Sequence, residues 1–482
     1  MTRALGSGGL DLVIAQVRHT LDNGLRVIVL ELPHLHSVSV ALMVKAGPRY
    51  ESPSTNGISH LVEHLLFRGT SKHPSSVDLN AAIEELGGEV NGLTQRDATT
   101  IHMTVPPRSA EAGLELLAEM CTAPRFSGLA IEKETVIEEI LDTIDSGGFE
   151  NDIDTLSRKA LWSGHPISMP VAGTVENVER FTLKQVRTHF RRTFVAANAV
   201  LCIAGPVSTN RVLTAATNAF AKMPRGKALS DGPAPRPAQS LPIQIQETED
   251  SQVSVLLSFP APHEHDPRFS PLLLLRRILD DGFSSRLRQA VSEQRGLAYS
   301  VAASIDVYAD TGAMDLDATC APKKLVLTVA QMLATLKTLV EDGISEEELE
   351  RAKIRHRAEL EFGLDDSHEI CGWYGSATLI GSRQGYSDRL AEAMRVKRSE
   401  IDALARDIFD PARCVLTLVG PAHPSAISKL ERILGRAPGS TLWLGEEDNG
   451  SVEPVEPMEL LALTEWATKG ARSARPGLRV AG

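Results

Sequence analysis

A long internal repeat limits the folds that this chain can adopt. The segment Phe194–Pro206 (FVAANAVLCIAGP) recurs as Phe409–Pro421 (FDPARCVLTLVGP), at an offset of 215 residues. Solenoid repeats have periods of about 20–50 residues, so this period predicts two homologous halves instead. A helix-like segment precedes each copy and another follows it: 183–191 and 210–220 in the first half, 399–408 and 425–434 in the second.

The repeat divides the sequence into an N-terminal half, 1–225, and a C-terminal half, 243–436. The stretch 226–242 is rich in Pro, Gly and Ser and is expected to be a linker. The tail, 437–482, lies outside the repeat and is expected to be partly disordered, with a possible strand at 440–444. Strands and helices mix in each half, which predicts an α+β fold with each sheet covered on one face.

The N-terminal half shows a clear series of elements. A hairpin signal at Asp22-Asn23-Gly24 separates two short β-type segments, and a Gly87-Gly88 pair ends a helical pattern. The expected strands are 16–20, 26–30, 37–44 and a strand-like stretch 89–105 with a turn at 95–98, and the expected helices include 76–86, 109–121 and 129–144.

Three groups suited to metal chemistry lie in one apolar segment, 57–70: His60, Glu63 and His64. The segment contains no proline and reads as a buried helix. Residues four apart share a helix face, so His60 and His64 can present two imidazoles to one zinc ion. Glu63 is three residues from His60 and adjacent to His64, so its side chain is expected near the same zinc ion, where a carboxylate can take a proton from a metal-bound water. The alternative, histidines buried for packing alone, is costly because three titratable groups would be desolvated without a partner.

A catalytic zinc needs a third protein ligand, and the acidic segment 131–142 offers candidates. Glu132 and Glu139 lie two turns apart and share one helix face, whereas Glu134 and Glu138 share another. Periodicity does not decide between these faces, because the flanking apolar residues lie between them. An ordinary solvated acidic helix is the alternative to a ligand role.

The string HLVEHLLFRGT, 60–70, resembles the active-site helix of the pitrilysin, insulysin and mitochondrial processing peptidase family, the inverzincins. The length and the repeat are most similar to the small bacterial members. The resemblance implies two halves that face each other like a clam shell around a closed chamber. It also implies one Zn²⁺ per chain, bound by His60, His64 and Glu139, with Glu138 as the fallback ligand.

The family pattern places its glutamate ligand before an aliphatic residue in a Val-x-x-Glu-Ile string, which matches Glu139, 75 residues after His64. A supporting glutamate seven residues earlier would be Glu132. The resemblance further implies that Glu63 activates the water. In the second half, the offset of 215 carries His60 to Leu275, so that half has lost the metal ligands.

Substrate-binding residues are implied by the same resemblance. Asn91, Gly92 and Thr94 match a family strand beside the zinc, whose edge pairs with an extended peptide. Tyr299 matches a tyrosine that reaches the substrate from the second half, where a phenol can stabilise an oxyanion. The arginine that normally precedes it by seven residues is Ser292 here. Either a neighbouring arginine (286, 288 or 295) replaces it, or a homologous partner subunit carries the intact Arg/Tyr pair.

These features predict a zinc metalloendopeptidase, acting on short or extended peptides or in peptide processing, as a homodimer or heterodimer. The alternative is a non-catalytic or partner-dependent subunit of a heterodimeric peptidase or assembly complex. The formal net charge of −12 argues against nucleic acid as a main partner.

Neither a signal peptide nor a membrane-spanning segment is expected, because residues 1–10 have no unbroken apolar run and no stretch is long enough to span a bilayer. Five scattered cysteines without a Cys-x-x-Cys pair favour a reducing compartment, by default the cytoplasm.

Overall fold

The computed structural model describes residues 14–144, 150–237, 242–444, 463–464 and 466–467. The first half contains a six-stranded sheet built from β1 (Gln16–Thr20), β2 (Arg26–Glu31), β3 (Val38–Val44), β4 (Glu89–Thr94), β5 (Thr99–Val105) and β6 (Ala199–Gly205). Its helices are α1 (Ile58–Leu66), α2 (Ser76–Glu85), α3 (Ala110–Thr122), α4 (Leu129–Leu141), α5 (Ile153–Leu161), α6 (Val175–Arg180), α7 (Leu183–Thr193) and α8 (Thr209–Ala219).

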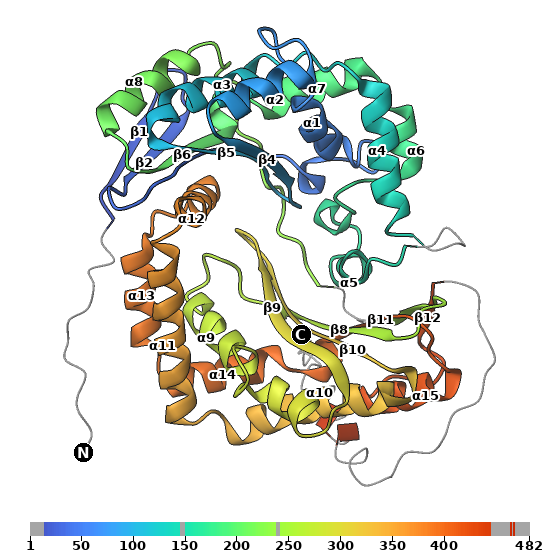
Figure 1. The fold of residues 1–482 in the computed structure, drawn as a ribbon. Coiled ribbons are helices and arrows are strands. Elements are labelled where there is room, and N and C mark those ends of the chain that lie inside the picture. The colour runs from blue at the N-terminus through green and yellow to red at the C-terminus, as the bar shows by residue number, and fades with distance from the viewer. Residues whose placement is uncertain (1–13, 145–149, 238–241, 445–462, 465, 468–482) are drawn as a thin grey trace, which may run out of the picture.

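The second half contains another six-stranded sheet, built from β7 (Ile243–Gln246), β8 (Val253–Ala261), β9 (Ala298–Val307), β10 (Gly312–Cys320), β11 (Val415–Val419) and β12 (Leu442–Trp443). Its helices are α9 (Phe269–Leu279), α10 (Leu325–Asp342), α11 (Glu346–Gly363), α12 (Ser367–Leu379), α13 (Tyr386–Arg395), α14 (Arg398–Ile408) and α15 (Pro424–Ile433). The two sheets face each other across the middle of the molecule (Figure 1).

The strand orders of the two sheets reflect the repeat. The first is β1-β2-β6-β3-β5-β4 and the second is β12-β7-β11-β8-β10-β9. Strands at the same place in the two orders are related by the repeat, except for the first strand of each order, β1 and β12. There β12 from the C-terminal tail runs parallel to β7, whereas β1 runs antiparallel to β2. This arrangement confirms the predicted α+β fold of two homologous halves.

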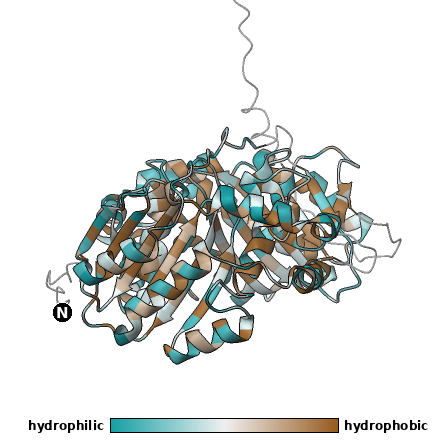
Figure 2. Cartoon of the chain, turned by 90° about the horizontal axis from the view of Figure 1, so that it is seen from above, coloured by the Kyte–Doolittle hydropathy of each residue, from teal (hydrophilic) through white to brown (hydrophobic). Residues whose placement is uncertain are grey.

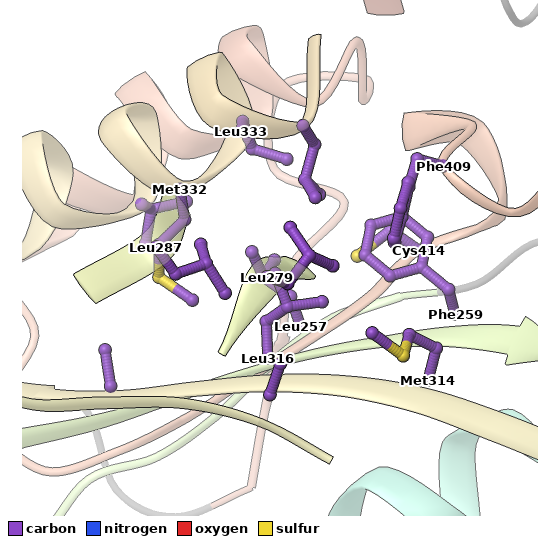
Figure 3. Close-up of a cluster of buried hydrophobic side chains, with 14 of the residues drawn as sticks. Leu257, Phe259, Leu279, Leu287, Met314, Leu316, Met332, Leu333, Phe409 and Cys414 are labelled. Carbon is purple, nitrogen blue, oxygen red and sulfur yellow. The ribbon is translucent and has the colours of Figure 1, made fainter. Parts of the chain in front are cut away.

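Each sheet packs its outer face on its own helices. In the first half this core joins β2, β3, β5 and β6 to α1, α3, α7 and α8. In the second half, side chains of β8 and β10 meet those of α9 and α10, with Leu257, Leu279, Leu316 and Leu333 at the centre (Figure 3). Hydrophobic residues run along the strands, and the helices mix hydrophobic and hydrophilic positions (Figure 2). Amphipathic helices on half-covered sheets account for this distribution.

The inner face of each sheet is covered by a helix from the opposite half, which differs from the expectation of sheets covered on one face. α12 of the second half lies on β3 and β6, and α5 of the first half lies on β8 and β11 (Figure 1). α5 and α12 are related by the offset of 215, so the exchange is reciprocal. The physical reason is that these inner faces are apolar, with Met43 and Cys202 fully buried against α12.

Polar contacts join the halves at the same places. Arg158 of α5 forms salt bridges with Asp306 and Asp315 of the second sheet. Ser367 of α12 shares hydrogen bonds with Ser37 and Ser39 of the first half, each at 2.9 Å between the hydroxyl oxygens. The two halves are therefore held together by buried charge pairs as well as by apolar packing.

The expected linker, 226–242, is described over 226–237 and 242. Asp231 within it accepts hydrogen bonds from Lys45 at 2.8 Å and from Tyr50 at 2.6 Å, so this residue is tied to the first half. Of the expected tail, Leu463 is buried in the second core, and the possible strand at 440–444 appears as β12. Most of the tail that is expected to be partly disordered, 445–462, 465 and 468–482, lies outside the described residues, as do residues 1–13.

The other expected elements of the first half, from β1 to α4, are confirmed within two or three residues, except that α1 ends at Leu66, four residues before the end of the segment 57–70. All five cysteines are buried and free. Among the described residues, no helix combines the length and apolarity that a bilayer crossing requires.

Candidate metal centre

α1 brings the two histidines of the motif together. His60 and His64 lie one turn apart, and their Nε2 atoms are 3.2 Å from each other. Their rings meet edge to face, with centroids 4.6 Å apart. Both side chains are half-buried on one side of α1, whose other side packs into the first core. Two imidazole nitrogens at this distance need a proton or a cation between them.

α4 supplies the carboxylate that faces this pair. Glu139 Oε2 is 3.6 Å from His60 Nε2, and Glu139 Oε1 is 3.6 Å from His64 Nε2. One ligand atom from each of the three residues lies within 4.8 Å of the others, the one such group of His, Cys, Asp or Glu in the part of the chain that the structure describes. Glu134 and Glu138, on the same helix, do not belong to it.

Glu132 lies two helical turns before Glu139 on α4. It contacts His64 at Nδ1, the ring nitrogen that does not face Glu139. Its Oε2 lies 2.9 Å from His64 Nδ1. Since a carboxylate accepts, Nδ1 carries the proton and Nε2 of His64 is left with its lone pair toward Glu139 and His60. Arg68 forms a salt bridge with the other oxygen of Glu132. This chain of contacts fixes the orientation of the His64 ring.

The donor set fits a zinc ion. Burial lowers the pKa of His60 to about 4, and the nearby His64 adds to the effect. His60 is therefore neutral near pH 7, as a metal ligand must be. Its Nδ1 is buried without a hydrogen-bond partner, so among the described residues only its Nε2 has polar neighbours. Two neutral imidazoles and one carboxylate are a common zinc donor set, with a position left for water.

Glu63 is held beside the trio by two residues of β4. Its Oε2 accepts a hydrogen bond from Thr94 Oγ1 at 3.0 Å. A Cβ at Gly92 would lie 2.3 Å from Glu63 Oε1, so only glycine leaves room for the carboxylate. Burial raises the pKa of Glu63; His64 and the Thr94 hydroxyl counter this, and Glu139 adds to it. Glu63 is 8% exposed.

A chamber of about 770 Å³ lies between the two halves. Thr94, which donates a hydrogen bond to Glu63, is among its lining residues, whereas Glu63 and the three residues of the trio are not. Burial raises the pKa of Asp97 on its wall to about 6, with Arg49 opposing this shift. Eight acidic and three basic side chains line the chamber: Asp97, Glu150, Asp152, Asp154, Asp231, Glu264, Asp306 and Asp315 against Lys45, Arg96 and Arg158.

The other residues named from the sequence as substrate-binding are not part of the trio. Asn91 is exposed on β4, which pairs with β5 and forms the edge of the sheet as far as the structure describes the chain. Tyr299 is 89% exposed on β9, the corresponding edge of the second sheet. It shares no hydrogen bond, salt bridge or ring contact with His60, His64 or Glu139 in the described structure.

The region around Ser292 contains arginines that are already engaged. Ser292 lies in a π-helical turn, 288–293, where its hydroxyl faces Ala298 O at 3.5 Å. Arg286 forms a salt bridge with Glu348, and Arg288 stacks on Phe283 with 4.6 Å between guanidinium carbon and ring centre. Arg286 and Arg288 are thus used within the second half.

The sequence did not reveal two residues that bear on this site. Arg68 stands four residues after His64, so helical spacing could have linked it to the motif. Glu51, whose carboxylate contacts the start of α1, gives no such signal, because the contact spans an irregular connector.

Comparison with protein families identifies both halves. Residues 26–175 match the family described as Insulinase (Peptidase family M16), and residues 180–355 match the Peptidase M16 inactive domain. A protein of Mycobacterium leprae described as an uncharacterized zinc protease is 30% identical over 418 residues, 84% of this chain and 91% of that protein. One of Streptomyces coelicolor with the same description is 29% identical over 422 residues, 86% of this chain and 91% of that protein.

Solved structures share the fold. A protease from Helicobacter pylori superposes with a TM-score of 0.77 at 21% identity, over 85% of this chain and all of that one. A peptidase M16 inactive domain from Pseudomonas fluorescens gives 0.76 at 20% identity, over 85% of this chain and 98% of that one.

Proposed function

The chain belongs to the insulinase family of peptidases, and we propose that it is a zinc-dependent metalloendopeptidase that hydrolyses extended peptides. The main support for this function is that ligand atoms of His60, His64 and Glu139 lie within 4.8 Å of one another, with the carboxylate of Glu63 beside them. Within the described residues the second half contains no comparable group of metal-binding side chains, so one centre per chain does the chemistry.

His60, His64 and Glu139 would hold the zinc ion, with Glu132 orienting His64. When bound there, zinc acts as a Lewis acid that polarises the peptide carbonyl and lowers the pKa of water. Glu63 takes a proton from the attacking water and delivers it to the leaving amine. Thr94 and Gly92 hold the Glu63 carboxylate in place for both transfers.

The exposed edge of β4 would bind the substrate as an added strand, with Asn91 beside the scissile bond. Backbone pairing of this kind selects extended peptides. The acidic excess on the chamber wall favours peptides with basic side chains. In a quenched-peptide assay, a substrate with Lys and Arg is therefore expected to be cleaved faster than its Glu-substituted copy, and added salt should reduce the difference.

The proposal is tested by the same assay on variants that separate binding from chemistry. Glu63→Gln is expected to keep zinc and lose at least about a thousand-fold in kcat, because the proton acceptor is gone. Glu139→Gln is expected to lose zinc and activity together. Glu138→Gln, an exposed neighbour, is the matched control and should behave like the wild type. A Glu63→Gln enzyme with near-normal turnover would contradict the mechanism.

A partner-dependent form of this activity is the second candidate. It is favoured by Ser292, by the engagement of Arg286 and Arg288 within the second half, and by the exposure of Tyr299. In this form, a homologous subunit, or a second copy of this chain, brings its own second-half residues to the peptide at the centre described above.

A further inference from the structure

We propose that Glu51 is a positioning residue of the metal centre: its carboxylate caps the N-terminus of α1 and thereby fixes the place of His60. The inference rests on the proposed function, because it assigns a role in the same centre. Glu51 lies in the connector between β3 and α1, and nothing in the ligand spacing points to it.

Both carboxylate oxygens of Glu51 accept hydrogen bonds from the start of α1. Oε1 accepts from the Ser59 amide at 2.8 Å. Oε2 accepts from the Gly57 amide at 2.9 Å and from Asn56 Nδ2 at 3.1 Å. Glu51 is 7% exposed, and within the described residues it forms no salt bridge with a basic side chain. The start of α1 is therefore its main electrostatic partner.

α1 needs a cap from outside because it has none of its own. The first amides of any helix lack partners within the helix. Ser, Thr, Asp or Asn usually satisfies them from the N-cap position, but here that position is Gly57, which has no side chain. A negative charge at this end also interacts favourably with the helix dipole. Loss of the Glu51 carboxylate would leave buried amides unsatisfied.

Other contacts also constrain the first turn of α1. If Glu51 is changed, the helix therefore cannot shift freely to find new partners for its first amides. A Cβ at Gly57 would lie 2.5 Å from Ala172 O, which shows how closely two backbone segments meet. Ser59 Oγ accepts from the Gly47 amide at 2.9 Å and lies 2.9 Å from His189 Nε2. Ser59 directly precedes His60, and metal–ligand distances tolerate about 0.2 Å.

Two measurements on Glu51→Gln test the inference. Hydrogen exchange over residues 57–66 of the metal-free chain should accelerate, because the Gln amide group presents a donor to backbone donors. The dissociation constant for zinc, measured against a chromophoric chelator, should rise at least about ten-fold, as for other residues that orient ligands. Glu51→Asp keeps the charge on a shorter side chain and should give a smaller rise.

Glu119→Gln is the matched control. Glu119 is 8% exposed, and it accepts hydrogen bonds in the loop after α1, from Thr70 and from the Lys72 amide. The Glu119→Gln variant should have a lower melting temperature, and its zinc affinity should stay within about two-fold of the wild type, a change of about 0.4 kcal/mol in binding free energy.

An unchanged zinc affinity in Glu51→Gln, or an equally large loss of zinc affinity in Glu119→Gln, would overturn the role of Glu51 but not the proposed function. A wild-type chain without zinc affinity would overturn the proposed function as well.

Discussion

At the residue scale, the arrangement around Glu63 makes a sharp prediction. Thr94→Val removes the hydroxyl that donates to Glu63 while keeping its shape. Because that hydrogen bond lowers the pKa of Glu63, its loss raises the pKa further, and Glu63 must be ionised to accept a proton. The acidic limb of the kcat/KM profile should therefore move to higher pH, and kcat should fall about ten-fold.

Zinc content and Thr94→Ser provide the controls for this prediction. Zinc should remain at the wild-type level in Thr94→Val, and Thr94→Ser should restore the profile because its hydroxyl can donate to the same oxygen. An unshifted acidic limb in Thr94→Val would show that the hydroxyl does not act on Glu63.

The sequence predicted the residues of the centre whose relation is local. His60 and His64 follow from helical spacing, and Glu139 from a resemblance to the family string, because periodicity on α4 left two faces open. The contact of Thr94 with Glu63 was not predicted, since it depends on how β4 packs against α1. Thr94 was expected to bind substrate, a role that stays a prediction. The contact of Glu51 with α1 was not predicted either, because it depends on how the irregular connector before the helix folds.

At the scale of elements, the exchange of α5 and α12 makes Arg158 a test of how the halves are joined. Arg158 is 1% exposed and lies between Asp306 and Asp315 of the second sheet. Arg158→Ala leaves these carboxylates without their partner, which should cost about 3–5 kcal/mol in the free energy of unfolding. Denaturant unfolding measures this loss.

Arg180→Ala is the control for Arg158. Arg180 pairs with Glu176 on the exposed surface of α6, so its loss should change stability by less than about 0.5 kcal/mol. If the two variants were equally stable, the contacts of Arg158 would not hold the halves together.

The exchange itself could not be predicted from the sequence. Helical periodicity indicates that a segment has an apolar face, but it does not say which sheet that face covers. The strands β1 to β5 were predicted closely because hairpin and turn residues mark their ends. The strand β12 was expected only as a possibility, and its pairing with β7 is a long-range contact.

At the scale of the whole molecule, the position of Tyr299 predicts complementation between subunits. If Tyr299 acts on the centre of another copy, Tyr299→Phe and Glu63→Gln chains should each cleave peptide poorly. Their mixture should regain about a quarter of the wild-type activity, because half of the randomly formed dimers are hybrids with one intact site.

Dilution provides a second arm of this test, since activity per chain should fall as dimers dissociate. A fully active Tyr299→Phe chain, or a mixture no better than its components, would contradict action between copies. In that case a different homologous subunit would be the partner to seek.

If His60, His64 and Glu139 bind a single zinc ion, the zinc content of the purified chain must depend on these residues. After saturation with zinc and gel filtration, elemental analysis is predicted to find one zinc per wild-type chain and none in the His60→Ala, His64→Ala double variant. A wild-type chain without zinc, or a double variant that retains it, would show that these residues do not form a zinc site.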